Sequence, residues 1–265
     1  MTSSATAIRF EEAALASGVR LRYADAGPRT GAPVLLLHGY SDSWYSFSML
    51  LDLLAPNLRL IIPDQRGHGD SQKPLSGYTP ASLAQDALSL LDAVGLERAA
   101  VVGHSMGGFV AQHLAALAPQ RVTQVVLAGS AARSANDAVR GLSATVASLT
   151  DPVDEGFVRE FQQSTIWRPV PPSFFERAVE ESLKLPARVW RSVLSGLLQP
   201  YVPLSAPACP THLFWGDRDA IFNREDQEEL LRLIPGAKLH LFPNTGHALH
   251  WEAPAEFARR LSGIL

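Results

Sequence analysis

Short apolar runs alternate with longer stretches of helical periodicity along most of the chain. Residues 19–23, 34–37, 59–62, 99–102, 122–128, 212–215 and 238–242 show strand patterns, and we expect the first of these strands to be antiparallel. A helix capped by Thr79 and ended by Gly95 presents one apolar face, formed by Leu83, Ala87, Leu88, Leu91 and Val94. A second helix is expected over residues 106–118, closed by Pro119. The alternation predicts a mostly parallel sheet covered by helices on both faces.

The alternation stops after Ser130. Residues 131–208 contain no strand pattern, but aromatic and proline residues are frequent there. Because compact domains rarely contain such a long structureless loop, we predict a helical cap inserted between two strands. The expected organisation is therefore a core domain of residues 1–130 and 209–265 with a cap of residues 131–208.

The candidate chemistry begins at a Gly-x-Ser-x-Gly motif, Gly103-His104-Ser105-Met106-Gly107, which lies between a predicted strand and a predicted helix. A sharp strand-to-helix turn exposes the serine hydroxyl, and small residues on either side allow that turn. The helix that begins there points free N–H groups at developing negative charge. A phosphate-binding loop is the rival interpretation, but the motif lacks both the GxGxxG and the GK[ST] pattern.

A nucleophilic serine needs a base, and the base needs an orienting acid. His247 follows a turn after the last predicted strand and is the preferred base, with His250 as the alternative. Asp219 and Asp217 both follow the strand at 212–215, and Asp219 is preferred because it reaches further over the sheet edge. The order Ser, Asp, His along the chain is that of the hydrolases with this motif.

With these residues, the sequence resembles the α/β-hydrolase superfamily over nearly its whole length. The blocks that carry the resemblance are His38-Gly39-Tyr40, the loop of residues 64–71, the serine motif, residues 216–219, and Gly246-His247. The resemblance implies an eight-stranded, mostly parallel sheet flanked by helices, with a helical cap. It also implies an oxyanion hole formed by the backbone N–H groups of Tyr40 and Met106. Because Ser105 stands where epoxide- and halide-processing relatives carry aspartate, those activities are not expected.

The resemblance predicts a serine hydrolase that cleaves a carboxylic ester or a lactone without a cofactor or metal. Aromatic residues suggest an apolar or bulky substrate, and the candidate substrate-binding residues are Trp44, Trp167, Phe174 and His104. Two alternatives stay open. The same three side chains could serve a perhydrolase, a cofactor-free haloperoxidase or a C–C bond hydrolase, or the protein could be a receptor-like ligand-binding protein with slow turnover.

Composition limits the partners. The chain has 265 residues, a formal charge of −3 and one cysteine, so neither nucleic acid binding nor an intrachain disulfide is expected. The N-terminal residues show no secretory signal pattern and no apolar run is long enough to span a membrane, which predicts a soluble, cytoplasmic protein. The predicted partner is a small ester or lactone, and the sequence gives no oligomeric state.

Overall fold

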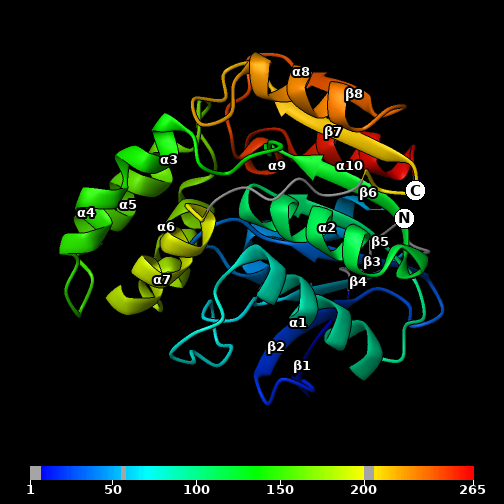
Figure 1. Cartoon of the computed structure of the whole chain (residues 1–265), viewed down its shortest axis with the longest axis horizontal. Coiled ribbons are helices and arrows are strands. Elements are labelled where there is room, and N and C mark those ends of the chain that lie inside the picture. Colours follow the sequence, from blue (N-terminus) through cyan, green and yellow to red (C-terminus); the bar gives the residue numbers. More distant parts are fainter. Residues whose placement is uncertain (1–6, 55–57, 200–205) are drawn as a thin grey trace.

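One mixed sheet organises the protein. The computed structural model describes residues 7–54, 58–199 and 206–265. Within these residues, eight strands form the sheet in the order β1-β2-β4-β3-β5-β6-β7-β8 (Figure 1). Their bounds are β1 Ile8–Ala14, β2 Arg20–Ala26, β3 Ala32–Leu37, β4 Leu58–Pro63, β5 Ala99–His104, β6 Val122–Ala128, β7 Thr211–Gly216 and β8 Lys238–Phe242. Strand β2 pairs antiparallel with both neighbours and every other adjacent pair is parallel, which confirms the predicted sheet.

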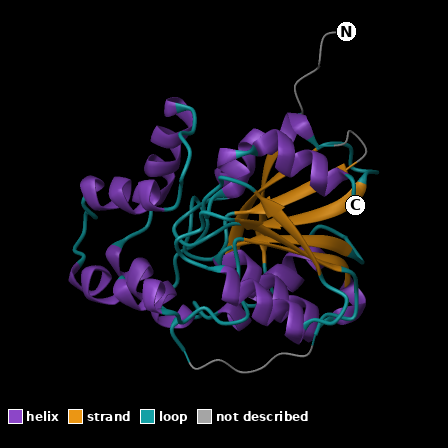
Figure 2. Ribbon diagram, turned by 90° about the horizontal axis from the view of Figure 1, so that it is seen from above, coloured by secondary structure: helices purple, strands orange, loops and turns teal. Residues whose placement is uncertain are grey.

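Helices cover both faces of the sheet (Figure 2). One face carries α1 Pro80–Ala93, α2 Met106–Leu117 and α8 Arg224–Leu233, and the other carries the 3₁₀ segment η1 Trp44–Leu53, α9 Leu249–Glu252 and α10 Pro254–Ser262. A second 3₁₀ segment, η2 Pro119–Arg121, follows α2. Among the described helices, none combines the length and the apolar character that a membrane crossing requires.

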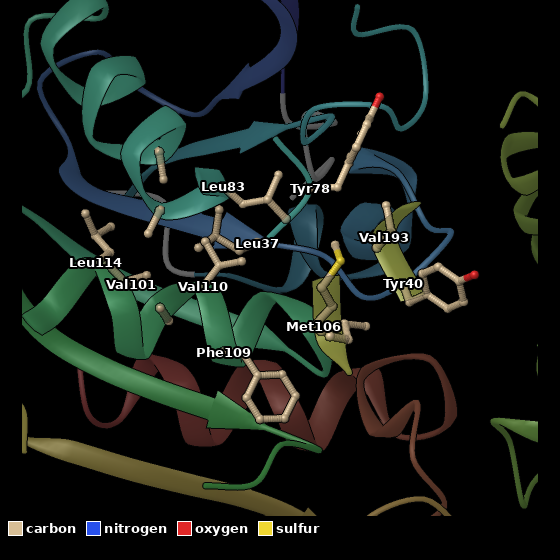
Figure 3. Packing of buried hydrophobic residues seen from close by; sticks show 14 of the residues in the cluster. Leu37, Tyr40, Tyr78, Leu83, Val101, Met106, Phe109, Val110, Leu114 and Val193 are labelled. Carbon is tan, nitrogen blue, oxygen red and sulfur yellow. The ribbon is translucent and has the colours of Figure 1, made fainter. Parts of the chain in front are cut away.

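The strands alternate their side chains between two apolar cores, as the pleat of a sheet requires. In β3, Leu35 and Leu37 belong to the core beneath α1 and α2, whereas Val34 and Leu36 belong to the core beneath η1 and α10. Figure 3 shows the first core, where Leu37 and Val101 lie against Val110 of α2. Both faces of the central strands are therefore buried, and this fixes the position of the loops at their carboxyl ends.

Helix α1 follows its sequence signals. The Thr79 side chain accepts a hydrogen bond from the Ser82 N–H, Pro80 occupies the first helical position, and Gly95 adopts a φ of +68° just beyond the helix. These are the expected start and stop features, because proline needs no N–H partner there and glycine tolerates the left-handed conformation.

Five helices, counted over the described part of residues 131–208, separate β6 from β7. They are α3 Asp137–Gly141, α4 Ser143–Ser148, α5 Glu155–Ser164, α6 Pro172–Leu183 and α7 Ala187–Leu197, and we call them the inserted helices. They lie to one side of the sheet, where the arrowheads of β6 and β7 point (Figure 1). The described residues of this segment contain no strand, in agreement with the sequence pattern. Their division from the core as a cap domain stays a prediction.

Candidate active site

Ser105 lies at the sharp turn between β5 and α2. Its backbone has a φ of +51° and a ψ of −115°, a strained conformation for a residue with a side chain. Close backbone packing explains the two glycines of the motif. A Cβ on Gly103 would lie 2.2 Å from the Gly107 carbonyl oxygen, and a Cβ on Gly107 would lie 2.1 Å from the Leu37 carbonyl oxygen. The motif therefore brings the serine turn into main-chain contact with the end of β3.

His247 and Asp219 form a buried pair on the loops after β8 and β7. His247 Nδ1 lies 2.9 Å from Asp219 Oδ2, and the other carboxylate oxygen accepts hydrogen bonds from the N–H groups of Ile221 and Phe222. Because an ionised carboxylate only accepts, the proton of a neutral His247 sits on Nδ1 and leaves the Nε2 lone pair free. The Asp219 side chain is fully buried, so this orientation is held within the protein.

Ser105 and His247 line the same cavity, but no hydrogen bond joins their side chains within the described chain. Catalytic hydrogen bonds commonly tighten only when a substrate is bound, so this spacing is compatible with a nucleophile and its base. His104 connects the serine turn to the loop that carries His247, because its Nε2 donates to the His247 carbonyl oxygen at 3.1 Å. Burial and the neighbouring His250 and His247 hold the pKa of His104 well below its ordinary value, so it stays neutral.

The alternative acid and base occupy other places. Asp217 is one-third exposed, and its nearest cation is the adjacent Arg218, at 3.9 Å. His250 is completely buried, and its Nε2 lies 2.9 Å from Ser46 Oγ, outside the cavity wall. Burial lowers the pKa of His250 to about 3, which makes it a neutral packing group. Of the four candidate acids and bases, His247 lines the cavity with Ser105, and Asp219 is its hydrogen-bond partner.

The His38-Gly39-Tyr40 segment continues β3 into the site. Gln65 holds its start, because the Gln65 N–H donates to His38 Nε2 at 3.0 Å and the Gln65 amide donates to the His38 carbonyl at 2.8 Å. Tyr40 and Met106 both line the cavity. Neither of their backbone N–H groups donates to another group of the described chain, so both can serve a ligand oxygen.

A cavity of about 240 Å³ joins these parts. The core supplies Tyr40, Ser105 and Met106 to its wall, and α3, α5 and α7 supply residues such as Val139, Phe161 and Leu194. Most of this wall is apolar, which is typical of a site for a small organic ligand. Among the described residues, no group of three or more His, Cys, Asp or Glu side chains is arranged to hold a metal ion.

Comparison with known proteins identifies the family that shares this fold. A family model described as the alpha/beta hydrolase fold matches residues 32–254. The chain belongs to the α/β-hydrolase family. It is 29% identical over 266 residues to 2-hydroxymuconate semialdehyde hydrolase from Pseudomonas sp. (strain CF600), covering 95% of this chain and 92% of that protein. A soluble epoxide hydrolase from Corynebacterium sp. (strain C12) is 39% identical over 102 residues, which span 38% of this chain and 35% of that enzyme.

Solved structures agree with this assignment to the α/β hydrolases. The crystal structure of a hydrolase from Pseudomonas aeruginosa PA01 has a TM-score of 0.85 and 26% identity, covering 96% of this chain and 97% of the other. The eight-stranded sheet with flanking helices is therefore the fold of this α/β hydrolase.

The three aromatic residues predicted to bind substrate do not line this cavity of the α/β hydrolase, and their part in substrate binding stays a prediction. Trp44 packs between Phe10 and Tyr45, and Phe174 packs against Trp251 and Tyr45. Trp167 is 61% exposed beneath the Arg218 guanidinium. None of the three lines the cavity, whereas His104 does. Aromatic character indicated packing here, because it does not specify which side of a segment faces a ligand.

Two polar residues of the cavity wall had not been anticipated. Asp42 follows the Tyr40 segment, and Gln162 lies on α5. Both side chains are buried. Burial raises the pKa of Asp42 to about 6, although hydrogen bonds from Gln162 and Ser46 oppose this shift. The available signal for Gln162 was its place four residues after Val158 on the apolar face of an amphipathic helix, where an uncharged polar side chain needs a reason.

Proposed function

We propose that this protein is a serine hydrolase that cleaves a carboxylic ester or a lactone through an acyl-enzyme. The observation that carries the proposal is the 2.9 Å contact between His247 Nδ1 and Asp219 Oδ2, beside a cavity that Ser105 shares. The strained backbone of Ser105 and the two N–H groups free to bind an oxyanion support the same reaction.

In the proposed mechanism, Ser105 Oγ attacks the carbonyl carbon while its proton passes to His247 Nε2. The oxyanion accepts hydrogen bonds from the Tyr40 and Met106 N–H groups, each worth about 3–4 kcal/mol in enzymes of this kind. Asp219 stabilises the imidazolium through Nδ1–H. His247 then protonates the departing alcohol. It next removes a proton from water, whose oxygen attacks the acyl carbon, and as the bond from that carbon to Ser105 Oγ breaks, His247 returns the proton to Ser105 and the acid leaves.

The decisive test replaces the nucleophile. Ser105→Ala is expected to abolish hydrolysis of a p-nitrophenyl ester and labelling by a fluorophosphonate, while circular dichroism and Tm stay at the wild-type values. Ser164→Ala is the matched control, because it removes another hydroxyl from the cavity wall, one that donates to the Phe161 carbonyl. Undiminished turnover in the Ser105 variant would refute the proposal, and a wild-type protein inert to the probe would favour a binding protein.

Hydrolysis of a C–C bond in a dienoic ketone is the second candidate. The similarity to 2-hydroxymuconate semialdehyde hydrolase, which extends over 95% of this chain, favours it. The same Ser105, His247 and Asp219 would serve both reactions, so the assays must compare substrates. A kcat/KM for a dienoic ketone that exceeds the value for esters by more than tenfold would replace the ester proposal with this one.

A further inference from the structure

Gln162 connects the inserted helices to the loop that carries Tyr40. Its amide nitrogen Nε2 lies 3.1 Å from Asp42 Oδ1, 3.3 Å from Ser41 Oγ and 2.8 Å from Ser182 Oγ. The Gln162 side chain is only 1% exposed, yet it lines the cavity that contains Ser105. A buried amide in this position has a defined orientation, and its partners determine which end faces a ligand.

Two of those partners, Asp42 and Ser182, require a donor from Gln162. The ionised Asp42 carboxylate can only accept hydrogen bonds. The Ser182 hydroxyl already donates to the Ala178 carbonyl at 3.0 Å, so it can only accept from Gln162. The nitrogen must therefore point at Asp42 and Ser182, and the carbonyl oxygen Oε1 points the other way. Oε1 has no hydrogen-bond partner among the described residues.

The other polar side chains of the cavity wall, like Gln162 Oε1, offer hydrogen-bond acceptors to a ligand. The hydroxyl groups of the wall, apart from Ser105, donate to backbone carbonyl groups, and His104 donates to the His247 carbonyl. The hydroxyl bonds run from Tyr40 to Trp190, from Ser134 to Leu197, from Ser164 to Phe161 and from Thr165 to Gln162. The lone pairs that remain are acceptors. Apart from Ser105 and His247, the polar side chains of the wall therefore present acceptors to a ligand.

The charged side chains of the cavity wall also disfavour an anionic ligand. Among the described residues that line the cavity, none is lysine or arginine, and the neutral His104 supplies no cation. The Asp42 carboxylate is the charged group of the wall outside the catalytic residues. A substrate carboxylate here would lose its hydration without gaining a cation, and it would lie near a second negative charge.

From this geometry we infer that the hydrolase selects an uncharged acyl compound with a hydrogen-bond donor, such as a hydroxyl or an amide N–H, and that Gln162 Oε1 recognises this donor. The inference rests on the proposed function and narrows its substrate class. Gln162 is the specificity-determining residue, and Asp42 is a positioning residue because it acts through the orientation of the Gln162 amide.

The test uses methyl hexanoate and derivatives that carry a hydroxyl at carbon 2, 3 or 6, each compared with its methoxy counterpart. Monomethyl adipate supplies a charged chain of the same length. Proton release at pH 8 gives kcat/KM for each ester. We expect one hydroxyl position to exceed both the plain and the methoxy ester by about tenfold, which is what one buried hydrogen bond contributes. Monomethyl adipate should be disfavoured by about a hundredfold, since burial of an unpaired ion is costly.

Two variants connect this preference to the amide. Gln162→Met, of similar size, should reduce the hydroxyl-to-methoxy ratio to about one, whereas the control Gln227→Met should keep it. Gln227 is as buried as Gln162 and donates to the Ser130 carbonyl, outside the cavity wall. Should Gln162→Met fail to fold, Asp42→Asn provides a second route. Asparagine can donate as well as accept, so Ser182 alone then holds the orientation of the Gln162 amide, and the hydroxyl-to-methoxy ratio should fall below the wild-type value.

The outcomes separate the inference from the proposed function. No preferred hydroxyl position, a preference that survives in Gln162→Met, or efficient cleavage of monomethyl adipate would each overturn the inference. Binding of the same esters to Ser105→Ala, measured by ligand-observed NMR, does not depend on catalysis. If the wild type cleaves none of the esters but Ser105→Ala still binds the hydroxy ester more tightly than the methoxy ester, the proposed function fails and the inference stands.

Discussion

Replacement of Asp219 by asparagine tests the orientation of His247 without removing a side chain. Asp219 Oδ1 accepts hydrogen bonds from the Ile221 and Phe222 N–H groups, at 2.8 and 3.0 Å. Asparagine can keep both bonds only if its oxygen takes the Oδ1 position. Its NH₂ group then faces His247 Nδ1, which must accept, so the imidazole proton moves to Nε2 and points at Ser105.

A His247 with its proton on Nε2 cannot remove the Ser105 proton. In known Ser-His-Asp triads the wrong tautomer lowers kcat by about 10⁴-fold, which corresponds to ~5.5 kcal/mol of transition-state stabilisation. Because both backbone hydrogen bonds persist, Tm should stay within a few degrees of the wild type. The assay is p-nitrophenyl ester hydrolysis with kcat determined at saturation, together with thermal unfolding of the same preparations.

Asp217→Asn is the matched control, because Asp217 lies two residues away, is one-third exposed and does not contact His247. We expect its kcat to stay within twofold of the wild type. An Asp219→Asn enzyme that retains more than a tenth of wild-type kcat would refute the assignment of Asp219 as the residue that sets the His247 tautomer.

Three further predictions concern the scaffold. Gly107→Ala should lower the unfolding free energy by about 1–3 kcal/mol and reduce activity, because its Cβ meets the β3 carbonyl at 2.1 Å, whereas Gly141→Ala, with open space around it, should not destabilise the protein in thermal unfolding. His250→Gln should weaken the fall of the unfolding free energy at acidic pH, measured by urea titrations at a series of pH values. Burial lowers the folded-state pKa of His250 from 6.5 to about 3, so the unfolded state binds the extra proton and stability is lost as pH falls from 6.5 to 3, on the order of 4–5 kcal/mol for this group; an unchanged fall would contradict this. Arg66→Met should cost about 3 kcal/mol in the same measurement, since two 2.7 Å contacts to the buried Asp86 are lost, and a cost below 1 kcal/mol would show that the pair contributes little.

The central sheet could be predicted because its strands are buried on both faces and their sequences are nearly continuous apolar runs. Strand β1 was not recognised, since it lies at the edge of the sheet and only Ala13 within it is buried, so its amphipathic signal is weak. The inserted helices could be predicted as a class but not individually. Several are only one or two turns long, such as α3 and α4, and short helices depend on tertiary packing more than on local sequence.

The loops around Ser105, Asp219 and His247 could be anticipated because strand ends in a parallel sheet meet at one edge, and glycines mark where the backbone turns. The cavity wall could not. Gln162 lies 121 residues from Ser41 along the chain, and only the folded arrangement of α5 over the Tyr40 loop brings them together. The sequence does not indicate which way a large aromatic side chain points, and Trp44, Trp167 and Phe174 do not line the cavity.

The contact between the Gly107 backbone and the Leu37 carbonyl has a consequence for redesign of the protein. Main-chain atoms pack directly against each other where the serine turn meets the end of β3, so exchange of cavity-lining side chains elsewhere leaves that packing in place. The inserted helices supply other side chains to the cavity wall, such as Val139, Phe161 and Leu194. Libraries randomised at these three positions should therefore change which acyl groups fit while the catalytic geometry stays constant, which makes the chain a practical starting point for directed evolution.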